Sequence, residues 1–368
     1  MTSIAYCTNV HPAEDLAGVV AQLDRYAVPV REELGADTLA LGLWLAEPVA
    51  RGLAEDGAAR RRLAADLRAR GLEVSTLNAF PYGGFHHEVV KHSVYHPTWT
   101  DPRRTTYTLA CATVLADLLP DSASYGSIST LPLAWREPWT SDDNVRAQAS
   151  FDTVARFLRA EAARHGRPIR LAVEPEPGCV LDTVADAVSW LADRVDHEHI
   201  GICLDTCHLA VSFADPADAV ASIRRTGLSV VKVQASAALE VAEPGTAEGR
   251  DAIAAFVEPR YLHQVRENAP GGVLAADDLP EALDDLPAAH PWRVHFHVPL
   301  HARPTAPLTA TTDVLLTAVE AVRSGSDAMP HVEVETYTWT VLPGAGPDLA
   351  SGIAAELRWA SDHLANGA

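Results

Sequence analysis

Ionisable side chains follow several short apolar runs of the sequence, at the point where each run ends. Glu174, Asp205 and Glu335 each close such a run, and His295 and His297 lie in a later one. Burial of this many ionisable groups is unfavourable without a compensating cation. Two glutamates, an aspartate and at least one imidazole suit Mn²⁺, Co²⁺, Zn²⁺, Mg²⁺ or Fe²⁺. The pattern therefore predicts a divalent-metal site with positions left open for a substrate.

Strand alternation narrows the choice between neighbouring candidates. His295 and His297 project to the same face of an extended segment, so one can bind a metal while the other packs. Glu333 and Glu335 also share a face, and we favour Glu335 because it lies nearer the end of its strand. Glu174 precedes a proline and is held extended, which suits a rigid ligand. Its alternative role is a salt bridge to Arg170.

Three further features are compatible with a functional or a structural role. His208 follows Asp205 by one helical turn. It could bind the metal directly, orient a ligand, or be a residue of the helix without a role in the site. Lys232 shares a face with Gln234 and is either a nucleophile or phosphate partner, or is paired with a neighbouring carboxylate. The loop Phe80–Trp99 is rich in histidine and aromatic residues, and is either a lid over a sugar-like ring or a surface loop.

An alternation of apolar strands and helices must position these groups. We expect strands at 4–7, 38–44, 73–77, 124–131, 169–174, 199–205, 229–235 and 331–336. The expected helices begin near 12 and span 55–70, 102–118, 141–165, 183–194, 216–224, 309–323 and 347–364. Eight units result if about 236–300 is an insertion after strand seven, with strand-like pieces at 261–265, 272–276 and 293–299.

This alternation predicts an α/β fold, a (β/α)8 TIM barrel formed by one domain over 1–368. A doubly wound open sheet is the second choice. It is disfavoured because CTNVHP, and no glycine-rich phosphate-binding fingerprint, follows the first strand. In a barrel, the carboxyl ends of the strands form the active site, which is where the ionisable residues fall.

Composition excludes several classes of function. The 368 residues include 29 Lys+Arg and 49 Asp+Glu, a net charge of −20, which disfavours nucleic acid as a partner. Only two residues are lysine, so a lysine-rich patch for anionic membranes is absent, and no apolar run predicts a signal peptide or membrane span. The five scattered cysteines do not form a disulfide framework, and Cys203 and Cys207 lack further thiolates for a zinc cluster. We expect a cytoplasmic protein without a membrane partner and leave a homo-oligomer open.

Four segments resemble the xylose-isomerase-like TIM barrels, a superfamily of sugar isomerases, epimerases and metal-dependent apurinic endonucleases. They are AVEPEPG (172–178), CLDTCHLA (203–210), HFHVPLH (295–301) and VEVETY (332–337). The resemblance implies a metal-ligand set of Glu174, Asp205, His297 and Glu335. In the ketose epimerases of the superfamily, the two glutamates are also the acid/base pair.

A closer resemblance is to the EboE-like branch, encoded in gene clusters for metabolite traffic or natural-product assembly. It spans nearly the whole chain and rests on YCTNVHP (6–12), LNAFPYGGFH (77–86), VYHPTWTDPRR (94–104), KVQASAAL (232–239), YLHQV (261–265) and ETYTW (335–339). The branch has no firmly assigned reaction, so it implies a relationship and not a mechanism.

The chain departs from the epimerase pattern at the third ligand. In the epimerases strand seven carries a histidine about 26 residues after the aspartate, whereas here the comparable strand ends at Gln234. His297 follows only after the insertion. Gln234 and His263 are therefore alternatives to His297.

Together these features predict a metal-dependent isomerase or epimerase in a natural-product or metabolite pathway. Its substrate would be a sugar, polyol or cyclitol, with or without a phosphate group. Glu174 and Glu335 would exchange protons with the α-carbon, and His208 would orient a substrate oxygen. Candidate substrate contacts are Asn78, Glu176, His208, Lys232, Gln234 and His263. The alternatives are a di- or trinuclear hydrolase of a small phosphoester and a non-catalytic metabolite-binding or traffic protein.

Overall fold

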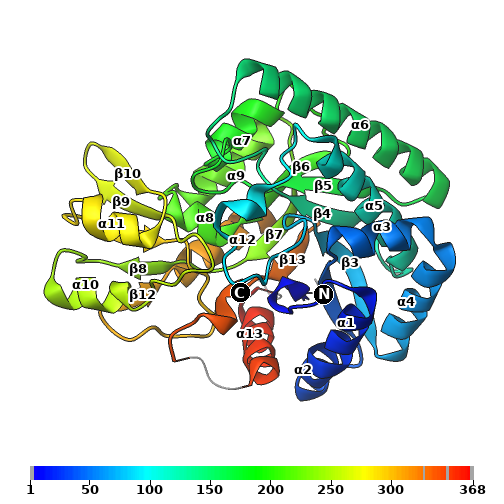
Figure 1. Cartoon of the computed structure of the whole chain (residues 1–368), viewed down its shortest axis with the longest axis horizontal. Coiled ribbons are helices and arrows are strands. Elements are labelled where there is room, and N and C mark those ends of the chain that lie inside the picture. The colour runs from blue at the N-terminus through cyan, green and yellow to red at the C-terminus, as the bar shows by residue number, and fades with distance from the viewer. Residues whose placement is uncertain (1–3, 326–327, 345–347, 365–368) are drawn as a thin grey trace.

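Eight parallel strands form a closed barrel in the computed structural model, which describes residues 4–325, 328–344 and 348–364 (Figure 1). Around the barrel the order is β1-β13-β7-β6-β5-β4-β3-β2, and the expected (β/α)8 TIM barrel is confirmed. The strands are β1 (Ile4–Cys7), β2 (Leu39–Trp44), β3 (Leu72–Asn78), β4 (Gly126–Thr130), β5 (Ile169–Val173), β6 (Ile200–Asp205), β7 (Val230–Ala235) and β13 (His331–Val334).

Helices cover the outside of the barrel. They are α1 (Leu16–Gln22), α2 (Val28–Glu33), α3 (Glu47–Glu55), α4 (Gly57–Ala69), α5 (Pro102–Leu118), α6 (Ser141–His165), α7 (Val184–Leu191), α8 (Thr206–Val211), α9 (Pro216–Arg225), α12 (Thr312–Arg323) and α13 (Leu349–Leu364). The helix expected at 55–70 is α4, and a separate helix, α3, precedes it. The two are divided at Asp56, whose carboxylate accepts hydrogen bonds from the amides of Ala58 and Ala59 and caps α4. The expected start of the last helix, Pro347, lies outside the described residues.

A second, antiparallel sheet lies between β7 and α12 in the sequence and to one side of the barrel in Figure 1. Its order is β10-β9-β11-β8-β12. Its elements are β8 (Leu239–Val241), α10 (Ala247–Ala254), β9 (Val265–Ala269), β10 (Gly272–Ala276), α11 (Leu279–Asp285), β11 (Trp292–Val294) and β12 (Leu308–Ala310). The sheet thus extends beyond residue 300, the expected end of the insertion.

Two of the strand-like pieces expected in this region have different bounds. The piece expected at 261–265 is mostly loop, and β9 begins at Val265. The piece expected at 293–299 ends as a strand at Val294, because the chain then turns toward the barrel. The amide of His295 donates to the carbonyl of Gln264, and the next residues leave the sheet. This departure brings His297 to the ends of the barrel strands.

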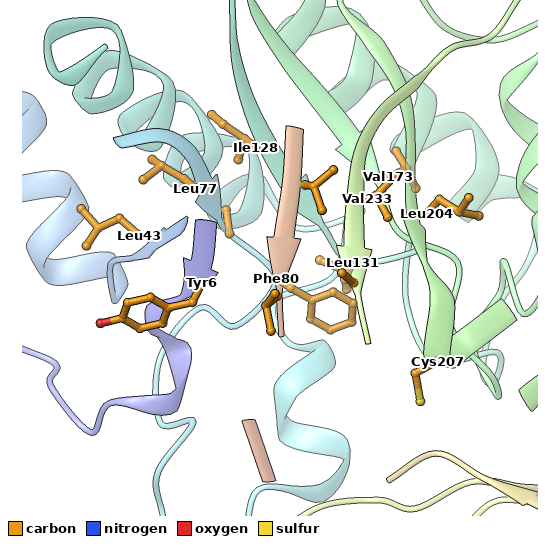
Figure 2. Close-up of a cluster of buried hydrophobic side chains, with 14 of the residues drawn as sticks. Tyr6, Leu43, Leu77, Phe80, Ile128, Leu131, Val173, Leu204, Cys207 and Val233 are labelled. Atoms are coloured by element: carbon orange, nitrogen blue, oxygen red, sulfur yellow. The ribbon is translucent and has the colours of Figure 1, made fainter. Parts of the chain in front are cut away.

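Apolar side chains of the strands fill the core between barrel and helices. Figure 2 shows part of this core, including Tyr6 of β1, Leu43 of β2, Leu77 of β3 and Ile128 of β4. Within the described ranges, no helix is both long and apolar enough to cross a membrane. The packed core holds the barrel strands in place, and with them the polar residues at the strand ends.

Candidate functional site

Several buried side-chain atoms at one end of the barrel have no hydrogen-bond partner among the described residues. They include Oδ1 of Asn9, Oε2 of Glu174, Oδ2 of Asp205, Oε1 of Gln234 and Nε2 of His297. Carboxylate oxygens of Glu174, Asp205 and Glu335 lie within 4.8 Å of one another, and so do ligand atoms of Asp205, His208 and His297. Buried polar atoms are normally paired, so this convergence forms a group that could hold a cation. The oxygen and nitrogen donors fit the divalent ions expected from the sequence.

Asp205 is oriented by its position between β6 and α8. Its Oδ1 accepts hydrogen bonds from the amide of His208 at 2.9 Å and from the hydroxyl of Ser236 at 2.8 Å. The aspartate is thus the N-cap of α8, and its second oxygen, Oδ2, has no partner. The same local structure that starts the helix also directs a carboxylate oxygen toward the other acidic groups.

His297 is held in the tautomer that a metal ligand requires. Its Nδ1 lies 2.8 Å from the backbone oxygen of Glu335, and because a carbonyl only accepts, Nδ1 carries the hydrogen. Nε2 therefore presents its lone pair. Burial lowers the pKa of His297 to about 4, which keeps the ring neutral. Among the three candidates for the third ligand, His297 thus offers a free nitrogen.

The other two candidates are placed differently. Both ring nitrogens of His263 are engaged, one 2.8 Å from Glu258 and the other 2.8 Å from the backbone oxygen of His295. Gln234 donates its amide hydrogen to Glu335 at 2.9 Å and keeps its oxygen unpartnered. The structure therefore brings Gln234 to the acidic cluster and turns His263 away from it.

Glu335 is held by three amide donors. Its Oε1 accepts from Asn9 at 2.6 Å and from Asn78 at 2.9 Å, and its Oε2 accepts from Gln234. Burial, followed by the charge of Asp205, raises the pKa of Glu335 to about 8. Burial and the charge of Glu335 also raise the pKa of Glu174 well above its usual range. These carboxylates repel one another, and a cation between them would relieve the repulsion.

Lys232 pairs with a carboxylate inside the barrel and does not line the cavity described below. Its Nζ lies 3.2 Å from Oε1 of Glu333, both side chains are fully buried, and the hydroxyl of Ser129 lies 3.1 Å from Nζ. Gly42 makes room for the pair, because a Cβ there would lie 1.4 Å from Oε2 of Glu333. The expected substrate contact of Lys232 is thus replaced by the carboxylate pairing that was its alternative. Arg170 lies over the ring of Tyr125, at 5.1 Å from its centroid.

A second group of potential ligands lies beside the first and comprises Glu176, His208 and His295. The Nδ1 of His208 lies 2.8 Å from the carbonyl of Pro175, and the Nδ1 of His295 lies 2.6 Å from the amide oxygen of Gln264. Both Nδ1 atoms therefore carry the hydrogen, and the two Nε2 lone pairs face each other at 3.0 Å. Such an arrangement requires a proton or a cation between the rings.

Gln264 was not singled out as functional from the sequence, and His295 was named only as the alternative to His297 on the same face. The alternation His-Phe-His was the available signal for His295, because it places both imidazoles on one face. Gln264 gave no comparable signal, because its role depends on contacts between segments far apart in the chain. Its amide nitrogen donates to the carbonyl of Pro177 at 2.9 Å, which fixes the side-chain oxygen toward His295.

A cavity of about 530 Å³ opens above these groups. Six of the residues expected in the site line it: Asn78, Glu174, Glu176, His208, His297 and Glu335. The loop expected at 80–99 also lines the cavity, through Phe80, Pro81, Phe85, Val90, Lys91, Val94 and Tyr95. The aromatic loop therefore belongs to the site.

Comparisons with known proteins agree with this architecture. Residues 30–253 match the family model described as Xylose isomerase-like TIM barrel. No curated protein matches the chain in sequence.

Similar solved structures include an L-ribulose 3-epimerase, at 13% identity, covering 99% of this chain and 95% of that one, with a TM-score of 0.55. A D-allulose 3-epimerase from Methylomonas sp. has 13% identity, coverage of 99% and 98%, and a TM-score of 0.54. The IolI protein with a bound zinc atom has 14% identity, coverage of 99% and 98%, and a TM-score of 0.51. At these identities the likeness concerns the fold. With the family match over more than half of its length, the chain belongs to the xylose isomerase-like TIM barrel family.

Proposed function

We propose that the protein is a metal-dependent isomerase or epimerase of a sugar, polyol or cyclitol. The observation that carries the proposal is the convergence of unpartnered atoms of Glu174, Asp205 and His297 beside Glu335. The names of the similar structures, two 3-epimerases of sugars and a protein with bound zinc, support the same reading. The resemblance to the EboE-like branch supports a place in a natural-product or metabolite pathway.

Glu174, Asp205, His297 and Glu335 would hold the ion. A bound divalent ion would polarise the substrate carbonyl and offset the negative charge that develops when the α-proton leaves. Glu174 and Glu335 would accept and return that proton, and a raised pKa suits a carboxyl group for this role near neutral pH. Asn9 and Asn78 fix the orientation of Glu335 through their amide hydrogens.

His208 would orient a substrate oxygen. It lines the cavity, and because its Nδ1 contacts the carbonyl of Pro175, its Nε2, 3.0 Å from Nε2 of His295, is the ring atom left for a ligand. Glu176 supports this part of the site, because its Oε1 accepts from the hydroxyl of Tyr95 at 2.8 Å.

The test is exchange of the α-proton of a ketose with deuterated solvent. Protein stripped with a chelator should lose exchange and regain it on addition of Mn²⁺, and Glu335→Gln should lose it while still folded. Glu320→Gln, where the side chain is 65% exposed, is the matched control and should keep full exchange. Exchange that persists in Glu335→Gln would rule out the acid/base assignment.

A second candidate function is hydrolysis of a small phosphoester by two or three metal ions. It is favoured by the opposed Nε2 atoms of His208 and His295 next to Glu176, which together could hold a second cation. Metal content separates the two functions. One ion per chain supports the isomerase, and two or three support the hydrolase.

A further inference from the structure

The residues that line the cavity fall into two groups of opposite chemical character. One group, here called the polar end, consists of Asn9, Asn78, Glu174, Glu176, His208, His295, His297 and Glu335. The other group, here called the apolar collar, consists of Phe80, Pro81, Phe85, Val90, Val94, Tyr261, Leu262 and Tyr337, and it contacts the polar end where the ring centroids of Tyr337 and His297 lie 4.8 Å apart. The collar residues come from three segments: the loop after β3, the stretch before β9 and the residues after β13. A ligand that contacts both groups must itself be amphipathic.

The apolar collar is held together by contacts between these segments. The ring centroids of Phe85 and Tyr261 lie 5.2 Å apart, and those of Tyr261 and Tyr337 lie 4.9 Å apart. The hydroxyl of Tyr261 donates to the carbonyl of Phe85 at 3.2 Å. The amides of Val90 and Lys91 donate to the carbonyl of Arg260 at 2.8 and 2.9 Å. The inserted region thus fixes the loop over the strand ends.

Hydroxyl groups of a substrate would find few hydrogen-bond partners in the apolar collar. A buried hydroxyl without a hydrogen bond is unfavourable by roughly 1–3 kcal/mol, whereas buried hydrocarbon is favourable. The collar is therefore suited to the apolar part of a ligand.

The charges around the cavity disfavour a phosphate group. Among the described residues that line it, Lys91 is the one lysine or arginine, and its ammonium group is paired with the carboxylate of Asp278. Glu174, Glu176 and Glu335 contribute carboxylates. A phosphate dianion in the collar would meet no free guanidinium or ammonium group from these residues, although such groups are its usual partners.

We propose that the substrate is a hydroxylated ring that carries an apolar substituent and no phosphate group. The ring would occupy the polar end, and the substituent would lie in the apolar collar. This inference rests on the proposed function, because it places the reacting carbonyl and hydroxyl at the metal site.

The experiment uses hydroxamates, which chelate a divalent ion through two adjacent oxygens and so share one anchor. Acetohydroxamate, hexanohydroxamate and phosphoglycolohydroxamate are titrated calorimetrically into the Mn²⁺-loaded full chain. A buried methylene strengthens binding roughly fourfold. We expect hexanohydroxamate to bind at least tenfold more tightly than acetohydroxamate, and the phosphorylated probe to bind no more tightly than acetohydroxamate.

Two adjacent valines provide matched variants. Val90 is buried and lines the cavity, whereas the side chain of Val89 is 56% exposed. Val90→Asn should remove most of the advantage of hexanohydroxamate over acetohydroxamate, and Val89→Asn should keep it. If Val90→Asn does not fold, Val90→Ala should still reduce the advantage several-fold.

Equal binding of the short and long probes, or tighter binding of the phosphorylated one, would overturn this inference. In that case α-proton exchange of a ketose would persist and the proposed function would stand. Failure of the protein to take up Mn²⁺, together with no binding of any hydroxamate, would instead refute the proposed function and this inference with it.

Discussion

At the residue scale, single hydrogen bonds decide which atoms are left to bind a cation. The hydroxyl of Ser236 donates to Oδ1 of Asp205, so that Oδ2 stays free. Partners of this kind orient metal ligands, and their loss lowers metal affinity by about 10–100-fold. We expect Ser236→Ala to weaken Mn²⁺ binding at least tenfold, measured by competition with a chelating dye. Ser212→Ala is the control, because its hydroxyl donates only to the backbone of Leu209. Unchanged affinity in Ser236→Ala would contradict the role of Asp205.

The buried pair of Lys232 and Glu333 leads to a prediction about stability. Both side chains are fully buried, so removal of one charge leaves the other uncompensated. Lys232→Met should lower the free energy of unfolding by about 3–5 kcal/mol, and the double variant Lys232→Met/Glu333→Leu by less. Urea unfolding of the four proteins in the double-mutant cycle measures the difference.

The exposed ion pair of Glu320 and Arg323 is the control for the buried pair. Glu320 is 65% exposed in its pair with Arg323, so Glu320→Gln should change the free energy of unfolding by less than about 1 kcal/mol. If Lys232→Met is as mild as Glu320→Gln, the pair does not carry the predicted charge interaction.

At the element scale, helix α13 connects the two segments that present His297 and Glu335. The carboxylate of Glu356 accepts from the amide of Leu300 at 3.0 Å and from the hydroxyl of Thr336 at 2.5 Å. Leu300 follows His297 by three residues, and Thr336 follows Glu335 directly. Helix α13 thus links the segment that contains His297 to the segment that contains Glu335.

The same carboxyl group predicts a pH dependence of stability. Burial raises the pKa of Glu356 to about 7, above an unfolded value of roughly 4.3. Below that unfolded value both states are protonated, and the group has no effect. Between about pH 4.3 and 7 only the unfolded state ionises, so stability falls by about 4 kcal/mol as the pH rises. Glu356→Gln should lose this component, measured as the difference in urea unfolding between pH 5 and pH 8. A slope identical to that of the unmodified protein would contradict the raised pKa.

Elements with strong local signals were predictable from the sequence. Helix α6 occupies the expected residues 141–165, because the Thr140–Asp143 capping box begins it and Gly166 ends it. Strands β8 and β12 were not anticipated, because each has three residues and is stabilised by pairing with a partner far away in the chain. Helix α3 was not anticipated, and the boundary between it and α4 depends on one capping side chain, that of Asp56.

At the scale of the whole molecule, the same distinction separates the predictable part of the site from the rest. Glu174, Asp205 and Glu335 could be proposed together because parallel strands of a closed barrel end on one side. The position of His297 could not be derived in this way. It depends on where β11 ends, at Val294, and on the contact of His297 with the backbone of Glu335.

Metal removal should therefore affect the stability of the whole chain. Three carboxylates with mutual repulsion lie in one buried site, and an ion bound only by the folded state stabilises it by about 2.7 kcal/mol at 100 times its Kd. For a chain of 368 residues this corresponds to a rise in Tm of roughly 3–4 °C. Calorimetry with Mn²⁺ and with a chelator measures the rise. Asp205→Asn should reduce it strongly, and Glu320→Gln, at a position 65% exposed, should not change it. A stripped protein with the same Tm as the loaded one would show that the unpartnered atoms of Glu174, Asp205 and His297 do not form a metal site.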